Sequence, residues 1–349
     1  MPEVRDVELR GLGPRDVRVK IAAAGVCHSD LSMFNGTLAP QFPLVLGHEA
    51  AGTVAEVGGA VEGLEPGDRV VLNWAPSCQS CWFCRHDEPW LCSATEGVIS
   101  TPFGRLADQA DVYGCLGVGA FAEEIVQPAN AVIPLPDGVP LDVAALLGCA
   151  VLTGVGAVRN TAGVRLGDSV LVLGLGGVGL ATLAAARLVG AAPIIAADVV
   201  PEKEELAREA GATHFLVSES KLARQVRGLT EGRGVDHAFE CVGTSATIRL
   251  AWQSARRGGK CTVVGVGGRD DEVRFNPLEL HHFARTLTSS VYGSTNPQRD
   301  IPMLAEQVEF GRLQVASLIT HRIGLDDVAD AFDRMRSGHG ARSLIELDK

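Results

Sequence analysis

Four cysteines fall close together in one part of the chain, with a spacing that suits metal binding. Cys78, Cys81, Cys84 and Cys92 form a C-x2-C-x2-C-x7-C run within fifteen residues. Four thiolates at this spacing can converge on one zinc ion and fill its coordination shell. Such a metal has a structural role, because it cross-links the loop that carries its ligands. An iron–sulfur cluster is one alternative, although no proline follows Cys92 and the last gap is longer than in ferredoxins. Four unrelated buried thiols and a nucleic-acid-binding zinc ribbon are the others.

A second set of metal-ligating residue types is dispersed along the chain. Cys27 lies in Gly-Val-Cys-His-Ser-Asp, His48 precedes Glu49, and Cys149 follows a glycine. Each piece alone is weak evidence, because a lone cysteine is usually a small buried hydrophobic residue. Together, two thiolates and an imidazole form the Cys₂His set of a catalytic zinc, which keeps a fourth position open for water or substrate. The sequence therefore predicts two zinc ions per chain, one structural and one catalytic.

A glycine-rich motif indicates a dinucleotide site. The apolar run Val170–Leu173 leads into Gly-Leu-Gly-Gly-Val-Gly at 174–179, and an alanine-rich helix follows. In this context the glycines permit a tight turn and let the backbone approach a pyrophosphate at the helix N-terminus. Asp198 ends the next strand about 20 residues later, where a carboxylate binds the adenosine 2′-hydroxyl and repels a 2′-phosphate. NAD is therefore favoured over NADP; a glycine turn made only for helix–strand packing is the alternative.

Two patterns of secondary structure must position these residues. Up to about residue 147, strand-like runs broken by turns indicate an all-β or α+β region with long loops, at 17–21, 52–57 and 68–72. From about residue 151, helical segments alternate with apolar strands at 170–173, 194–197, 214–217, 237–241, 261–265 and 286–291. This alternation predicts a doubly wound parallel sheet. The C-terminal tail is expected to rejoin the first domain, through helices at 303–310 and 326–336 and a strand at 343–347.

The composition excludes several classes of protein. A chain of 349 residues, 46% hydrophobic and 21% charged, is globular and long enough for two domains. The net charge of -11 disfavours a nucleic-acid-binding or membrane-binding surface. The N-terminus has no secretory signal, and nine cysteines, an odd number, favour reduced thiols in the cytoplasm over disulfides. The uncharged stretch 169–186 approaches membrane-spanning length, but a strand, a glycine turn and a buried helix explain it better.

In this order, the motifs resemble the zinc-dependent medium-chain alcohol dehydrogenases over nearly the whole chain, and especially their actinobacterial and class III-like branch. The matching segments are GVCHSD at 25–30, LGHEAAGTVAEVG at 46–58, the four-cysteine run, LLGCAVLTGVGA at 146–157 and GLGGVG at 174–179. The resemblance implies a Rossmann NAD-binding domain at 151–291. It also implies a GroES-like, mainly-β catalytic domain, with a structural zinc lobe, at 1–150 and 292–349. A homodimer or homotetramer is expected.

The resemblance implies roles for individual residues. Three of them are the expected ligands of the catalytic zinc: Cys27, His48 and Cys149. The resemblance makes Glu49 a nearby carboxylate that assists ligand exchange as a transient ligand, and Asp30 the acid that orients the zinc imidazole. Ser29 matches the hydroxyl that binds the substrate oxygen. Cofactor contacts are implied for Thr153, Gly174, Gly176, Gly177, Val178, Gly179, Asp198, Lys203, Val242, Val266, Val291 and Arg342.

The implied reaction is reversible, NAD-dependent oxidation of a primary alcohol to an aldehyde, in which a zinc-bound alkoxide transfers hydride to the nicotinamide. An alternative substrate is formaldehyde bound to a low-molecular-weight thiol such as mycothiol or glutathione; a distant alternative is an inactive NAD- and zinc-binding structural protein. Two positions depart from the family. His28 replaces a phosphate-binding arginine, and Ser32 replaces a histidine that accepts the outgoing proton. The remaining cysteines are interpreted as inert core thiols: Cys115, Cys241 and Cys261.

Overall fold

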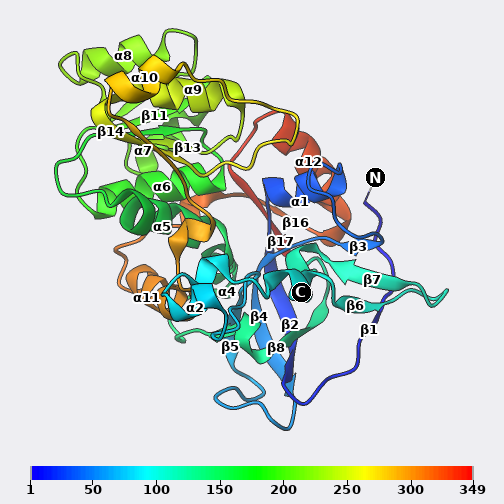
Figure 1. Ribbon diagram of the computed structural model, residues 1–349. Coiled ribbons are helices and arrows are strands. Elements are labelled where there is room, and N and C mark those ends of the chain that lie inside the picture. The colour runs from blue at the N-terminus through cyan, green and yellow to red at the C-terminus, as the bar shows by residue number, and fades with distance from the viewer. Residues whose placement is uncertain (1, 348–349) are drawn as a thin grey trace. The chain divides into compact units, whose positions relative to one another are not determined.

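The computed structural model describes residues 2–347, which form two compact units (Figure 1). The first unit contains the chain up to Leu152, Thr295–Arg312, and the chain from Ile319 onward. The second contains Thr153–Ser294 and Leu313–Leu318. The short segment Leu313–Leu318 therefore belongs to the second unit, whereas the predicted first domain contains all of 292–349.

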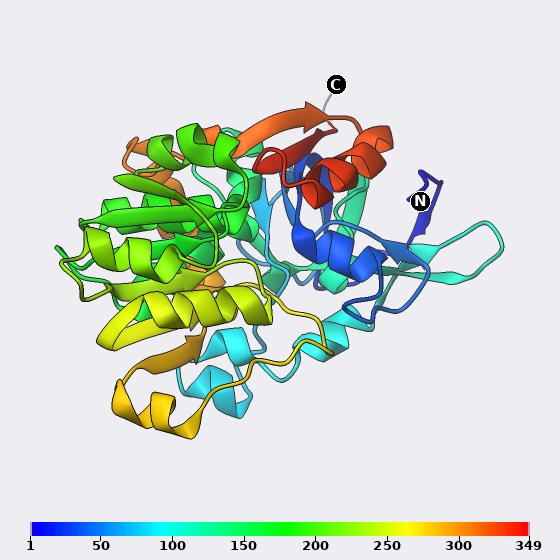
Figure 2. The same cartoon turned by 90° about the horizontal axis from the view of Figure 1, so that it is seen from above.

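The second unit is built on a six-stranded parallel sheet with the strand order β12-β11-β10-β13-β14-β15. The strands are β10 (Val170–Leu173), β11 (Ile194–Asp198), β12 (His214–Val217), β13 (Val235–Glu240), β14 (Ala255–Val263) and β15 (Thr286–Ser289). Helices cover both faces of the sheet (Figure 2), which explains why β10 is buried and apolar at every position. The helices are α5 (Ala150–Gly156), α6 (Gly177–Leu188), α7 (Glu204–Glu209), α8 (Leu222–Leu229), α9 (Ser245–Ser254) and α10 (Pro277–His282). The predicted doubly wound sheet is confirmed.

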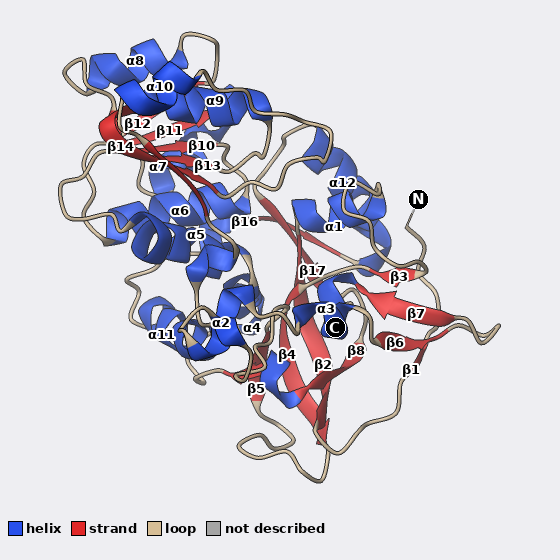
Figure 3. Ribbon diagram, viewed as in Figure 1, coloured by secondary structure: helices blue, strands red, loops and turns tan. Residues whose placement is uncertain are grey.

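The first unit is mainly β-structure (Figure 3). A seven-stranded sheet has the order β16-β17-β2-β4-β5-β9, with β8 paired to β2; a smaller sheet has the order β1-β6-β7-β3. The strands are β1 (Glu8–Leu9), β2 (Asp16–Val26), β3 (Leu44–Val45), β4 (Glu49–Val57), β5 (Arg69–Leu72), β6 (Pro102–Arg105), β7 (Asp111–Gly114), β8 (Glu124–Pro128), β9 (Val132–Pro134), β16 (Ile319–Ile323) and β17 (Arg342–Glu346). The helices are α1 (His28–Phe34), α2 (Trp82–Arg85), α3 (Thr95–Ile99), α4 (Leu141–Ala145), α11 (Pro297–Glu309) and α12 (Val328–Arg336).

The long strand β2 organises the core of this unit. Its inward side chains, Val17, Val19 and Ile21, are fully buried and alternate with more exposed positions, as expected for a strand with one face on the core. The C-terminal strand β17 pairs antiparallel with β2, and Leu344 lies opposite Gly25. The tail of the chain thus rejoins the first unit, as predicted.

Two elements, β14 and α11, begin six residues earlier than predicted. Strand β14 begins at Ala255, six residues earlier than expected, because its polar first half pairs with β13 across an irregular register. Helix α11 begins at Pro297 rather than at residue 303. A proline is well tolerated at the first helical position, because an N–H group there would have no acceptor within the helix. In both places hydrogen bonding to neighbouring backbone overrides the hydrophobic pattern.

The uncharged stretch 169–186 consists of β10, the glycine turn and most of α6. Among the described residues, no single helix is long and apolar enough to cross a membrane. Only a bent pair, Leu141–Gly148 with Ala150–Ala162, passes that test by length and composition.

Candidate active site and metal centres

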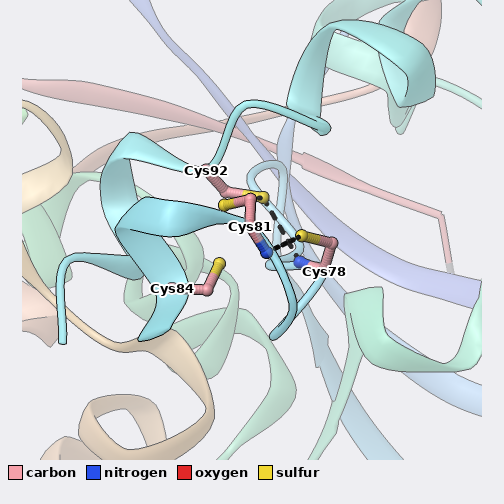
Figure 4. A group of neighbouring side chains, drawn as sticks. All are labelled: Cys78, Cys81, Cys84 and Cys92. Atoms are coloured by element: carbon pink, nitrogen blue, oxygen red, sulfur yellow. Dashed lines mark hydrogen bonds between the residues drawn. The ribbon is translucent and has the colours of Figure 1, made fainter. Parts of the chain in front are cut away.

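The four clustered cysteines converge in space (Figure 4). Their sulfur atoms all lie within 4.8 Å of one another. The short helix α2 starts just after Cys81 and carries Cys84, so that one turn brings both sulfurs to the same side. Backbone N–H groups of Cys78 and Cys81 donate to the sulfurs of Cys92 and Cys78, each at 3.3 Å. Hydrogen bonds from Cys84 and Ser93 lower the pKa of Cys81 to about 5. This donor set fits a four-thiolate zinc site.

The dispersed set, Cys27, His48 and Cys149, also comes together, with its ligand atoms within 4.8 Å of one another and all three side chains buried. Cys27 follows the end of β2 and precedes α1, His48 immediately precedes β4, and Cys149 immediately precedes α5. His48 Nε2 lies 3.4 Å from the sulfur of Cys149. The hydrogen bond between the two thiols lowers the pKa of Cys27 and, together with burial, raises that of Cys149. The residues fit a Cys₂His zinc site.

The other ring nitrogen of His48 faces a buried carboxylate. Nδ1 lies 3.0 Å from Oδ1 of Asp30, which is fully buried and also accepts N–H bonds from Cys27 and Gly47. Burial favours the neutral imidazole, but the charges of Asp30 and Cys149 outweigh it and raise the pKa of His48. This arrangement fixes which nitrogen of His48 is available to a metal. The hydroxyl oxygen of Ser29 lies 3.9 Å from the sulfur of Cys27, beside the ligand set.

Glu49 and Arg342 form a buried ion pair in the same unit. Arg342 Nη1 lies 3.5 Å from Oε2 of Glu49 and donates to the carbonyl oxygen of Val26 at 2.8 Å. Burial raises the pKa of Glu49 to about 7 against the opposing effect of the Arg342 charge. The family resemblance implied a role for Arg342 at the cofactor phosphates; in the structure its side chain interacts with Glu49, with the carbonyl oxygen of Val26 and with the sulfur of Cys27.

The glycines of the nucleotide motif occupy their positions for different structural reasons. Gly174 has a φ of +94°, and a Cβ on Gly179 would lie 1.9 Å from the carbonyl oxygen of Gly174. A Cβ on Gly176 would meet nothing within 4 Å. Gly176 is also the N-cap of α6, where helix N–H groups lack helical partners. Gly174 and Gly179 are thus required by the fold, whereas the position of Gly176 faces open space at the N-terminus of α6.

Asp198 ends β11, with its carboxylate held from three sides. Leu175 N–H donates to Oδ2 at 2.7 Å, Val200 N–H to Oδ1 at 3.1 Å, and the ammonium group of Lys203 lies 3.2 Å from Oδ2. Both charged side chains are buried. The structure therefore brings two predicted cofactor residues, Asp198 and Lys203, beside the glycine turn.

Three predicted cofactor contacts are exposed apolar side chains after the carboxyl ends of adjacent strands. Val242 follows β13, Val266 follows β14, and Val291 follows β15; they are 46%, 59% and 46% exposed. In a doubly wound sheet this edge is the one that binds ligands. Val178 is half-buried and Thr153 is buried.

Sequence reasoning missed two residues. Cys115, interpreted as an inert core thiol, contacts both Asp30 and His48. Glu240 is fully buried and accepts N–H bonds from Val242 and Gly243, which fixes the turn that carries Val242. The signal for Glu240 was a carboxylate that ends a strand directly after the apolar pair Ala238 and Phe239.

Comparisons with known proteins identify the family of the chain. Residues 13–137 match the model of the alcohol dehydrogenase GroES-like domain, and residues 177–309 match that of the zinc-binding dehydrogenase. The chain is 38% identical to S-(hydroxymethyl)glutathione dehydrogenase of Synechocystis sp., over 95% of this chain and 92% of the relative. It is 34% identical to the NDMA-dependent alcohol dehydrogenase of Amycolatopsis methanolica, over 98% of this chain and 95% of the relative.

A solved structure extends the similarity to the fold. Benzyl alcohol dehydrogenase of Acinetobacter calcoaceticus matches with a TM-score of 0.89 and 28% identity, over 99% of this chain and 95% of that one. The predicted GroES-like domain is confirmed by the family match. The chain therefore belongs to the zinc-binding, medium-chain alcohol dehydrogenase family of oxidoreductases.

Proposed function

We propose that the protein catalyses the reversible, NAD-dependent oxidation of a primary alcohol to an aldehyde. The observation that carries the proposal is the buried Cys27–His48–Cys149 set with Ser29 beside it. Two thiols and one imidazole leave a fourth ligand position for a substrate oxygen, whereas the four-cysteine site is closed.

Four of the predicted residues, Cys27, Ser29, His48 and Cys149, have defined tasks in the reaction. Zinc held by Cys27, His48 and Cys149 would supply Lewis-acid catalysis, and bound NAD would accept the hydride. Ser29 Oγ accepts the proton of the alcohol and donates its own onward. Ser32, on the same helix α1, cannot act as a base at neutral pH, so the proton must pass from Ser29 to water or to another group.

The cofactor residues support NAD as the acceptor. The open face of Gly176 and the N-terminus of α6 suit the pyrophosphate. Asp198 suits the adenosine 2′-hydroxyl, and its negative charge disfavours the 2′-phosphate of NADP. Val178, Val242, Val266 and Val291 offer apolar surface to the nicotinamide side of the cofactor. A homodimer or homotetramer in the cytoplasm is part of the same proposal.

A second candidate substrate is formaldehyde bound to a low-molecular-weight thiol. It is favoured by the similarity to an S-(hydroxymethyl)glutathione dehydrogenase. In the β6–β7 hairpin, Asp111 lies 3.1 Å from the exposed side chain of Arg105 and partly offsets the charge that Arg105 would offer to a glutathione carboxylate.

A substrate panel tests both candidates. Zinc-loaded protein is assayed for NAD reduction with primary alcohols, and with formaldehyde in the presence and absence of glutathione or mycothiol. Turnover of alcohols without thiol supports the first candidate; turnover of formaldehyde only with thiol supports the second. No NAD reduction in any arm, by protein that holds two zinc ions per chain, would refute both.

A further inference from the structure

The thiol of Cys115 lies on the outer side of the catalytic ligand set. Cys115 starts a 3₁₀ turn directly after β7 and is fully buried. Its sulfur lies 3.4 Å from Oδ1 of Asp30 and 3.9 Å from Nδ1 of His48. Because Nε2 of His48 faces Cys149, Cys115 and Cys149 lie on opposite edges of one imidazole ring.

Four groups that can donate hydrogen bonds surround the carboxylate of Asp30. A fully buried carboxylate is costly unless its oxygens accept hydrogen bonds. Oδ2 accepts from the N–H of Cys27 at 2.9 Å, and Oδ1 accepts from the N–H of Gly47 and faces Nδ1 of His48, both at 3.0 Å. The Cys115 thiol is a further donor within reach of Oδ1, at 3.4 Å.

Backbone hydrogen bonds hold Cys115 in place relative to His48. Ala120 N–H donates to the carbonyl oxygen of Gly47 at 2.9 Å, and Phe121 N–H donates to that of Leu46 at 2.8 Å. Gly47 has a φ of +93°, and a Cβ there would lie 2.4 Å from the ring of Phe121. The segment that carries Cys115 is therefore docked on the residues that lead into His48.

Asp30, His48 and Cys115 also have the residue types of a second metal site, with ligand atoms within 4.8 Å of one another. The hydrogen bonds already made by both oxygens of Asp30 argue against this. A metal there would also have to replace the proton of Nδ1 that Asp30 accepts.

We infer that Cys115 is a positioning residue for the catalytic zinc: its thiol donates to Asp30 Oδ1 and so fixes the carboxylate that orients His48. The inference rests on the proposed function, because it needs a metal on Nε2 of His48. Outer partners of metal ligands typically change metal affinity or activity about 10–100-fold when they are removed.

Three substitutions at this position separate hydrogen bonding from packing. Cys115→Ser keeps a donor, Cys115→Ala removes it, and Cys115→Val fills the space without one. Cys261→Ala is the matched control, since Cys261 is also fully buried but lies in the core of the second unit. Zinc release to a chelator is measured for each holoenzyme. Cys27→Ser removes a ligand of the catalytic zinc, so the release that remains in this variant identifies the phase of the structural zinc. The absorption spectrum of the cobalt-substituted enzyme reports the ligand geometry.

The expected result is about tenfold faster release of the catalytic zinc in Cys115→Ala and Cys115→Val, with an altered cobalt spectrum, lower kcat and unchanged KM for NAD. Cys115→Ser is expected to stay within about threefold of the unsubstituted enzyme, and Cys261→Ala to match it. Wild-type release rates in the Ala and Val variants would overturn the inference. Equally accelerated zinc release in Cys115→Ser and Cys115→Val would show that Cys115 acts through packing and not through a donated hydrogen bond. That result would also overturn the inference.

Metal content separates the remaining outcomes. Three metal ions per chain, falling to two in Cys115→Ala, would make Cys115 a ligand and refute its positioning role. A wild-type enzyme without the catalytic zinc would overturn the proposed function and this inference together.

Discussion

Arg342 and Glu49 form an ion pair in which both side chains are almost fully buried, with Nη1 and Oε2 3.5 Å apart. Arg342 comes from the last strand, β17, and Glu49 from β4, directly after the zinc-ligand candidate His48. Such a pair adds little to stability when intact, but either charge becomes costly when its partner is removed.

We therefore expect Arg342→Met to destabilise the enzyme by about 3 kcal/mol, measured by urea unfolding at fixed zinc concentration. Adding Glu49→Gln to this variant should recover part of the loss, because no buried charge is then left unpaired. A loss below about 1 kcal/mol in the single variant would mean that the two groups are not coupled. The KM for NAD of the double variant tests, separately, the phosphate-binding role that the family resemblance implies for Arg342.

Two glycine substitutions should separate cofactor binding from folding. Gly176→Ala places its methyl group in open space, so its stability should stay within about 1 kcal/mol while the KM for NAD rises about tenfold. Gly179→Ala places a methyl group 1.9 Å from the carbonyl oxygen of Gly174 and should cost more than about 2 kcal/mol of stability. Thermal unfolding and NAD titration of both variants provide the check. Equal stability losses would contradict it.

Asp198→Asn should relax the choice of cofactor. The amide keeps an acceptor for the N–H of Leu175 but removes the charge that repels a 2′-phosphate. The ratio of kcat/KM for NADP to that for NAD is expected to rise at least about tenfold. Glu202→Gln, a charge removal at an exposed position next to Lys203, is the control and should leave the ratio unchanged. If both variants shift the ratio equally, net charge rather than Asp198 sets the preference.

Cys81→Ser should remove one zinc and spare the other. The zinc content, measured by metal analysis, is expected to fall from two ions per chain to one, because the closed four-thiolate site loses one of its four ligands. The thermal unfolding temperature should drop, while the Cys27–His48–Cys149 site keeps its metal. Cys241→Ser, at a cysteine outside both candidate zinc sites, should retain two ions. A Cys81→Ser protein that still holds two zinc ions would exclude the lobe as a metal site.

His237 should make stability depend on pH. Burial lowers the pKa of its imidazole below the ordinary value of 6.5, although Asp168 Oδ2 lies 3.1 Å from Nε2. Below pH 6.5 the unfolded chain therefore binds more protons at this residue than the folded one, and stability falls as the pH decreases. His237→Gln retains a donor toward Asp168 without titrating. Urea unfolding between pH 7.5 and 5.5 should show a smaller loss in the variant; an identical loss would rule out His237 as the cause.

Much of the fold could be predicted because its signals are local. Apolar runs separated by helical segments gave the six strands of the parallel sheet, and the turn at 174–179 was recognisable from the spacing of its glycines. The beginnings of β14 and α11 were missed, because the polar residues 256–260 and the first turn at Pro297 carry no hydrophobic pattern.

The cysteine lobe was also visible in the sequence, since its four sulfurs come from fifteen consecutive residues. The catalytic set was predictable only because its residue types match a known family; nothing in the spacing from Cys27 to Cys149 requires them to meet. The position of Cys115 gave no signal at all. It is 85 residues from Asp30, and only the docking of 115–121 on 46–47 brings the thiol to the carboxylate.

The sequence by itself thus determined the four-cysteine set, the nucleotide turn and the doubly wound sheet, because short-range spacing and periodicity encode them. It indicated the catalytic set only through the resemblance to a known family. The tertiary structure alone decided which polar groups share a buried environment. It set Cys115 against Asp30, Arg342 against Glu49, and Glu240 against the turn at Val242. Each of these contacts joins groups that must satisfy one another away from water, and that requirement appears only when the chain is folded.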